Sequence, residues 1–194
     1  MTIGIDLDDV LASLMVSLVD FHNQRYKTTL TRNDFRHFDL WRTWGGNREE
    51  AIRKVYEFYE AKEFENVGTV PGAIDALASL KAMEHRLYVI TARPNHIIKK
   101  TEVWLERHFP KTFDGVHFTN AFIVSGPSRK KVDVCKELGV ELLIDDNLVY
   151  VNECATEGTP ALLFDAPWNQ GVLPAGVTRI SSWDEVVRYI TEKS

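Results

Sequence analysis

The chain has 194 residues, of which 44% are hydrophobic and 26% are charged, so it is long enough for one globular α/β domain with an insertion. Its formal net charge of -5 and its single short basic run, residues 129–131, argue against binding to a nucleic-acid polymer. No apolar run reaches the roughly 18 residues of a membrane-spanning helix, so no membrane partner is expected. Cys135 and Cys154 lack the spacing of metal or disulfide sites and are expected to be buried thiols. The first predicted strand begins at Thr2 with no signal peptide before it, which predicts a cytoplasmic protein.

The stretch IGIDLDDVL combines a strand with a cluster of acids. The predicted strand covers residues 2–5, and Asp6, Asp8 and Asp9 follow it before the apolar pattern of a helix over residues 11–26. Carboxylates this close repel one another, so a cation or protons must neutralise them, and hard oxygen ligands favour Mg²⁺. On these residues alone, a solvated acidic turn remains an equal alternative.

Residues 26–70 interrupt the regular pattern and are predicted to form a small helical insertion over the main domain. The first part is polar and aromatic, and Thr31 with Asp34 resembles a capping box that opens a short helix. A second capping signal at residues 47–50 precedes a predicted helix over residues 50–62.

Apolar strands alternate with helices in the rest of the chain. Strands are predicted over residues 87–90, 115–118, 141–144 and 160–164, and helices over residues 73–83, 95–108, 128–138 and 148–157, with a last helix after Ser182. This alternation predicts an α/β fold with a mostly parallel sheet and helices on both faces. The core domain then comprises residues 1–25 and 71–194.

Polar residues stand at the ends of these predicted strands or just beyond them. They are Asp6 and Asp8 after the first strand, Thr91 after the second, Lys131 downstream of the third, and Asp145 with Asp146 after the fourth. Because ligands bind at the carboxyl ends of parallel strands, we expect these side chains to converge on one crevice. For each residue alone, the alternatives are strand-end capping for the acids and a solvated helix face for the lysine.

In this order, the segments IGIDLDDVL, YVITAR, KKVDVCKELG and LLIDDN resemble the haloacid dehalogenase (HAD) superfamily of Mg²⁺-dependent phosphohydrolases. The superfamily pattern is an apolar strand ending in DxDx(T/V), a second strand ending in Ser or Thr, a lysine on a helix, and a strand ending in two acids. The match extends over the whole predicted core. The resemblance implies a Rossmann-like core, a C1 cap formed by residues 26–70, and Mg²⁺ as the cofactor.

The resemblance also implies roles for the first two motifs. Asp6 is the expected nucleophile, which forms an aspartyl-phosphate, and is also a metal ligand. Asp8 is the expected general acid for the leaving group and then the base for the attacking water, and its backbone carbonyl is a further metal ligand. Superfamily ATPases and phosphonatases usually lack this second acid, so Asp8 favours a phosphatase. Thr91 is expected to hydrogen-bond the phosphoryl oxygens.

A lysine is expected to neutralise the phosphate and the nucleophile together. Lys131 fits the spacing to Gly139 better than Lys130 does, and both remain candidates. Asp145 and Asp146 are expected to supply the remaining metal carboxylate and its water shell. The pattern does not distinguish which of the two binds Mg²⁺ directly.

Two further stretches resemble one family within this superfamily. YEAKEF at residues 59–64, followed by VPGA at residues 70–73, resembles the 5'(3')-deoxyribonucleotidases, in which a cap helix returns to the core through a PGA turn. The tail LFDAPWN at residues 163–169, with the later SWD, is similar to the bacterial nucleotidase relatives of that family. The sequence departs from the animal enzymes at Asp9, where they carry Gly, and at residues 92–93, where they carry Ser-Pro.

Aromatic residues in the cap are candidates for substrate binding. In the resembled family the cap stacks aromatic rings on the base, and Phe38, Trp41 and Trp44 are the candidates here, since aromatic rings stack on any base. An equal alternative is that these rings form the interior of the cap. Arg93 either binds the phosphate or braces its own loop.

These observations predict a Mg²⁺-dependent phosphomonoester hydrolase, a 5'-nucleotidase that acts on (deoxy)ribonucleoside monophosphates through an aspartyl-phosphate. Two alternatives stay open: a phosphatase of another small metabolite such as a sugar phosphate, and a catalytically idle HAD-fold binding protein. The expected partner is a small phosphomonoester, and the sequence does not define the oligomeric state.

Overall fold

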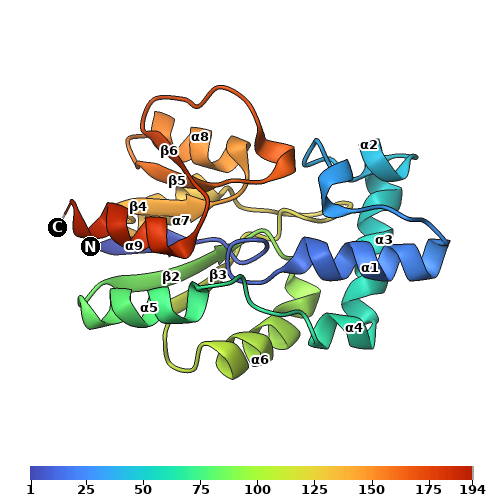
Figure 1. The fold of residues 1–194 in the computed structure, drawn as a ribbon, viewed down its shortest axis with the longest axis horizontal. Helices are drawn as coiled ribbons and strands as arrows, with labels where there is room; N and C mark the ends of the chain where they lie inside the picture. Colours follow the sequence, from blue (N-terminus) through green and yellow to red (C-terminus); the bar gives the residue numbers. More distant parts are fainter. Residues whose placement is uncertain (194) are drawn as a thin grey trace.

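The computed structural model describes residues 1–193, and its parallel sheet confirms the predicted fold class (Figure 1). The strands in the described part are β1 (Thr2–Ile5), β2 (Arg86–Thr91), β3 (Gly115–Phe118), β4 (Leu142–Asp145), β5 (Ala161–Phe164) and β6 (Val177–Ile180). They lie in the order β3-β2-β1-β4-β5-β6, and every pair of neighbours is parallel. The strand order reverses between β1 and β4, which is the point where ligand crevices form in such sheets.

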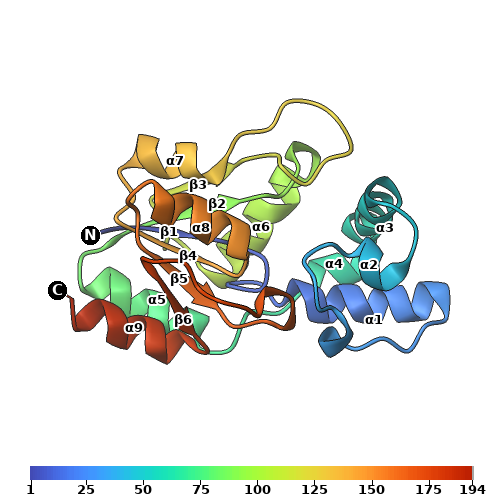
Figure 2. The same ribbon diagram turned by 90° about the horizontal axis from the view of Figure 1, so that it is seen from above.

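Helices cover both faces of the sheet (Figure 2). On one face lie α5 (Ala73–Ala82), α6 (Ile98–His108) and α9 (Trp183–Thr191), and on the other lie α7 (Lys131–Leu138) and α8 (Leu148–Thr156). The sequence of β4 accounts for the two layers: Leu142 and Ile144 belong to one apolar cluster and Leu143 to the other, because successive strand residues point to opposite faces. The short 3₁₀ turns η2 (Asn95–Ile97) and η3 (Pro167–Asn169) follow β2 and β5.

The predicted cap, residues 26–70, lies beyond the carboxyl ends of the strands (Figures 1 and 2). Its elements are η1 (Arg32–Asp34), α2 (Trp41–Trp44), α3 (Arg48–Glu60) and α4 (Lys62–Glu65). The helix α1 (Leu14–Tyr26) lies beside them and contacts α3 and α4. The predicted capping box at Asn47 is confirmed, and at Thr31 the carboxylate of Asp34 accepts from both the backbone N and the hydroxyl of Thr31. The exact bounds of the cap stay a prediction.

The helix predicted from residue 11 begins later, at Leu14, and residues 7–13 form a loop instead. Asp9 adopts a left-handed conformation in this loop, with a φ of 58°. Its carboxylate accepts hydrogen bonds from the backbone N of Met15 at 3.1 and 3.2 Å. The acid therefore caps the first turn of α1, and the apolar residues before that turn are buried in a loop rather than in a helix.

The strand β6 was absent from the sequence prediction. It is an edge strand with only Ile180 fully buried, so it lacks the alternation that identifies a half-buried strand. Cys135 and Cys154 are buried free thiols, as predicted. Within residues 1–193, no helix is long and apolar enough to cross a membrane.

Candidate active site

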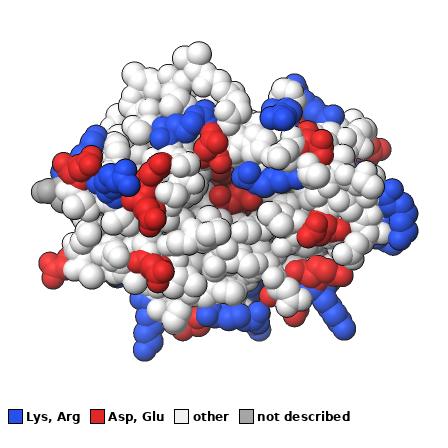
Figure 3. Space-filling view, in the orientation of Figure 1, with Lys and Arg blue, Asp and Glu red and all other residues white. Residues whose placement is uncertain are grey.

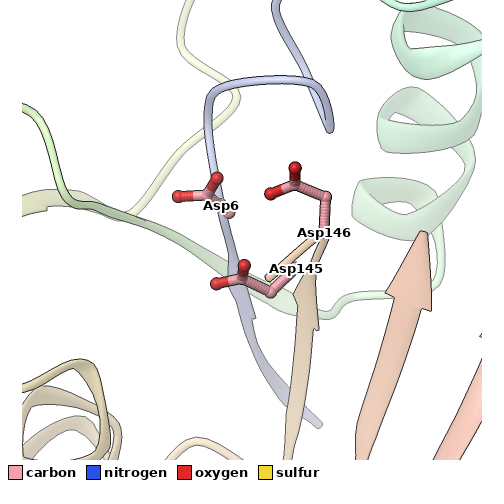
Figure 4. Close-up of side chains that lie close together, drawn as sticks. All are labelled: Asp6, Asp145 and Asp146. Atoms are coloured by element: carbon pink, nitrogen blue, oxygen red, sulfur yellow. The ribbon is translucent and has the colours of Figure 1, made fainter. Parts of the chain in front are cut away.

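Three carboxylates meet where β1 and β4 end. The two strands are paired, and the backbone N of Asp6 continues the pairing by donating to the carbonyl of Ile144 at 2.8 Å. This register places Asp6 beside Asp145, and Asp146 follows directly. Figure 4 shows the three side chains facing a common space, and they offer carboxylate oxygens that lie within 4.8 Å of one another.

Lys131, the first residue of α7, neutralises part of this cluster. Its Nζ donates to Oδ1 of Asp6 at 2.5 Å and to Oδ2 of Asp145 at 2.6 Å, and its side chain is 1% exposed. Burial alone would lower the pKa of Lys131, but Asp145 and Asp6 outweigh burial and raise it. The neighbouring Lys130 is 69% exposed and faces Glu153. The structure therefore brings Lys131, and not Lys130, into the crevice.

The remaining negative charge fits a divalent cation. Burial raises the pKa of Asp6 to about 7 in spite of Lys131, and burial with repulsion from Asp145 and Asp6 raises the pKa of Asp146 well above its usual value. One ammonium group thus faces three buried carboxylates. Carboxylate oxygens alone are hard ligands of the kind that Mg²⁺ prefers, so the donor set fits this ion.

The side chain of Asp146 is held by residues to which the sequence analysis assigned no role. Trp168 donates from Nε1 to Oδ2 of Asp146 at 2.7 Å. Asn169 donates from Nδ2 to the backbone carbonyls of Asp146 and Phe164 at 2.7 and 2.6 Å. Both residues lie in the LFDAPWN stretch, which indicated a family resemblance but not this contact. The backbone N of Asn147 donates to Oδ1 of Asp145 at 2.8 Å and orients the other strand-end acid.

Asp8 is paired with Arg93 across the crevice. Arg93 donates from Nη2 to Oδ1 of Asp8 at 2.6 Å and from Nε to both carboxylate oxygens at 3.1 and 3.2 Å. Thr91 is fully buried, and its Oγ1 accepts from the backbone N of Arg93 at 3.2 Å. Its hydroxyl proton is therefore available for another acceptor. Asp9 also lines the cavity, where burial and repulsion from Asp8, partly countered by Arg32, raise the pKa of Asp9 to about 7.

All the catalytic and metal-binding candidates except the fully buried Thr91 line a cavity between the sheet and the helices beside it. Figure 3 shows a hollow at this place with acidic side chains at its base. The apolar side chains around it come from α1, the cap and the loop after β3: Leu14, Met15, Leu18, Phe38, Leu40, Val55 and Phe122. Tyr59 also lines it, and burial together with the nearby Asp8 raises the pKa of its phenol. Of these residues only Phe38 was predicted from the sequence, because the spacing of the others is the same as that of ordinary core residues.

The three predicted cap aromatics lie in three different places. Phe38 lines the cavity and is 45% exposed. Trp41 lines an adjoining groove that also includes Phe38. Trp44 is packed inside the cap, where it stacks on His22 with the ring centroids 4.6 Å apart. The structure therefore brings only Phe38 of the three to the carboxylate cluster.

Comparison with known proteins places this arrangement among nucleotidases. A Bacillus subtilis protein named "Putative nucleotidase YqfW" is 26% identical over 189 residues, which cover 97% of this chain and 92% of that protein. A 5'(3')-deoxyribonucleotidase from Clostridium acetobutylicum is 27% identical over 173 residues, or 87% of this chain and 84% of that protein. The solved structure of the "putative HAD-hydrolase YfnB" from Bacillus subtilis, described as bound to magnesium, has a TM-score of 0.64 at 17% identity and covers 98% of each chain, which shows the HAD fold. The model of the family described as 5' nucleotidase, deoxy (pyrimidine), cytosolic type C protein matches residues 1–194, so the chain belongs to this family and is a phosphomonoester hydrolase.

Proposed function

We propose that the protein is a Mg²⁺-dependent nucleotidase that hydrolyses nucleoside monophosphates through an aspartyl-phosphate on Asp6. The observation that supports this most directly is the buried bridge from Lys131 to Asp6 and Asp145. A bridged carboxylate at a strand end is a positioned nucleophile, and the ammonium group beside it favours the approach of a phosphate dianion.

In the first step, the free oxygen of the Asp6 carboxylate attacks phosphorus, and the bond from phosphorus to the leaving oxygen breaks. Asp8, two residues further on, transfers a proton to that oxygen, so the nucleoside leaves as an alcohol. Lys131 neutralises charge on the phosphoryl group, and the hydroxyl of Thr91 donates to one phosphoryl oxygen.

In the second step, water attacks the phosphorus of the aspartyl-phosphate. Asp8, now a carboxylate, accepts the proton of the water, and the bond from phosphorus to the Asp6 oxygen breaks. Inorganic phosphate leaves, Asp6 is again a carboxylate, and Asp8 is again protonated for the next turnover. Protons and phosphoryl groups therefore balance over one cycle.

The carboxylates of Asp6, Asp145 and Asp146, with the backbone carbonyl of Asp8, would hold Mg²⁺ in this proposal. When bound, the ion supplies positive charge that offsets the charge of the phosphoryl group. The carboxylate geometry supports this assignment, and the magnesium described for the YfnB structure is consistent with it.

The leaving group is proposed to be a nucleoside because the walls above the acids are apolar. Phe38 offers an exposed ring at the cavity, and a base stacks on such a ring without needing matched hydrogen bonds. A contact between Trp41 and a substrate that reaches the adjoining groove stays a prediction. The cytoplasmic location of the protein also stays a prediction. Trp44 stacks on His22 and is not among the residues that line the cavity, so this proposal gives it no contact with the base.

A phosphate-release screen with Mg²⁺ tests the proposal. Nucleoside 5'- and 3'-monophosphates should release phosphate faster than sugar phosphates, and Asp6→Asn should abolish release from all of them. The exposed Asp20, changed to Asn, is the matched control and should retain full activity. Faster hydrolysis of sugar phosphates would replace the nucleotide assignment. If neither substrate class reacts and the protein does not bind beryllium fluoride with Mg²⁺, a binding protein without catalysis is the better description.

A further inference from the structure

We propose that Arg93 is a positioning residue that holds Asp8 in place for proton transfer, rather than a residue that binds the substrate phosphate. This inference rests on the proposed function, because it concerns the acid and base of that reaction. It departs from the sequence prediction, in which phosphate binding and loop bracing were the two alternatives for this arginine.

The contact between the two side chains is bidentate. Nη2 of Arg93 and Oδ1 of Asp8 are 2.6 Å apart, and Nε lies 3.1 Å from Oδ2. A planar guanidinium group in this arrangement fixes both the position and the plane of a carboxylate. Within residues 1–193, no other side chain hydrogen-bonds the Asp8 carboxylate.

Arg93 is itself fixed by elements of both the core and the cap. Its Nη1 donates to Oγ1 of the buried Thr101 in α6 at 3.0 Å. Its guanidinium carbon lies 5.1 Å from the ring centre of Phe64 in α4, and its backbone N donates to Thr91. Arg93 lines the cavity, but all three of its side-chain nitrogens donate to protein oxygens, and the side chain is only 1% exposed. A group that is this enclosed and engaged is poorly placed to bind a phosphate.

Asp8 needs such support because of its position in the chain. It lies in the loop of residues 7–13, before the left-handed Asp9, and its side chain is 23% exposed. A general acid works only within hydrogen-bond reach of the leaving oxygen, and small displacements reduce the rate strongly. Oδ1 accepts the short bond from Nη2, whereas Oδ2 accepts the longer bond from Nε and keeps a second lone pair for the proton that passes to the leaving oxygen and returns from water.

The dependence of the rate on the leaving group separates positioning from phosphate binding. An alkyl phosphate such as a nucleoside monophosphate needs a proton on its leaving oxygen, whereas p-nitrophenyl phosphate releases an anion that needs none. The ratio kcat/KM reports only the steps up to the departure of the leaving group. Arg93→Met should therefore reduce kcat/KM by about 10²-fold for the alkyl phosphate, which is within the range for a general acid, and by less than about fivefold for p-nitrophenyl phosphate.

The second step provides another measurement. Because Asp8 also activates water, the Arg93→Met variant should release one p-nitrophenol per enzyme in a rapid burst and then turn over slowly. Arg93→Lys keeps a charge and one donor and should recover part of the alkyl phosphate activity, and it serves as the test variant if the Met variant does not fold. Thr101→Val should show a smaller loss with the same substrate pattern. Arg25→Met, which removes an exposed arginine paired with Glu57, is the matched control.

Each remaining result leads to a different conclusion. Equal losses of kcat/KM for both substrates, with a raised KM, would show that Arg93 binds phosphate and would overturn the inference. Equal losses that follow the folded fraction measured by circular dichroism would show a structural role only and would also overturn it. A wild-type protein that hydrolyses neither substrate would refute the proposed function itself.

Discussion

The strand-end crevice and the helical cap hold their polar groups in opposite ways. In the crevice every buried charge has a short contact: Lys131 bridges Asp6 and Asp145, and Trp168 holds Asp146. In and beside the cap, aromatic packing dominates. His22 of α1 stacks on Trp44, and the buried Nε2 of His22 and Nε1 of Trp44 have no hydrogen-bond partner within residues 1–193.

This difference suggests a division of labour in which the crevice determines the reaction and the cap determines which substrates are accepted. The crevice is set by the pairing of β1 with β4, so the same acids meet wherever these strands form. The cap packs on the core through a shared apolar cluster and through side-chain hydrogen bonds that do not involve the acids, such as Arg48 to the carbonyl of Ile123 and Tyr56 to the carbonyl of Phe122. Substrate contacts made by the cap can therefore change without disturbing the acids, and mutations in the two regions should have different effects.

The largest effect is expected from breaking the crevice at Lys131. Lys131→Met leaves Asp6 and Asp145 buried without their cation, and the loss of one partner from a buried ion pair typically costs about 3–5 kcal/mol. We expect phosphatase activity to fall at least about 10²-fold and the midpoint of urea unfolding to decrease. Added Mg²⁺ should restore part of the stability, because it replaces some of the missing positive charge.

Lys130→Met is the matched control for this experiment. Lys130 is adjacent in the sequence but is 69% exposed, and exposed ion pairs contribute about 1 kcal/mol or less. The activity and the unfolding midpoint of the Lys130→Met variant should stay close to those of the wild type. If the two variants behaved alike, the bridge would have no special role.

A smaller effect on the same region is expected from Trp168. Trp168→Phe removes the indole N–H that orients Asp146 but keeps an aromatic ring in the same place. Loss of an outer contact to a metal ligand typically weakens metal affinity about 10- to 100-fold. The Mg²⁺ concentration for half-maximal activity, and the Mg²⁺ affinity measured by calorimetry, should shift by about 10-fold. Trp104→Phe, which removes an indole bond to Val67 away from the cluster, should leave the Mg²⁺ dependence unchanged.

The sequence was sufficient to predict the crevice because its residues are strand-end residues. Asp6, Thr91 and Asp145 each end an apolar run, and parallel strands bring such ends together. The lysine could be ranked by its distance to the helix stop at Gly139, which adopts a left-handed φ of 63°. The fold class followed from the same alternation of strands and helices.

The contacts between distant segments could not be predicted in the same way. Trp168 to Asp146 joins a 3₁₀ turn to a strand end, and Arg93 to Asp8 joins two loops. Neither contact lies within a helix or strand whose periodicity could predict it. The identity of a residue as arginine also does not show whether its side chain is buried or exposed. The positions of Phe38, Trp41 and Trp44 depend on cap packing, which aromatic spacing does not determine.

Phe38 tests the selectivity of the cap. Phe38→Ala should raise KM for nucleoside monophosphates about 5- to 10-fold, because stacking of a base on an aromatic ring contributes about 1–3 kcal/mol. Asp6 and Asp8 are untouched, so kcat should change little, and KM for p-nitrophenyl phosphate should change less than that for nucleotides. Steady-state kinetics on both substrates measures this. An equal rise in both KM values would assign Phe38 to the general shape of the cavity rather than to the base.

The smallest effect is expected from His22, which lies away from the reacting groups. Burial, with repulsion from Lys54, lowers the pKa of His22 to about 4. Between pH 6.5 and 4 the unfolded chain binds a proton at this residue that the folded chain does not, so stability falls as the pH falls through this window. His22→Gln cannot take up that proton and should show a flatter decrease in the free energy of unfolding between pH 6.5 and 4, even if its stability at pH 7 is lower because the stack on Trp44 is lost. Urea unfolding at several pH values measures both slopes, and equal slopes would mean that His22 is charged in the fold and that the apolar packing of the cap does not exclude charge.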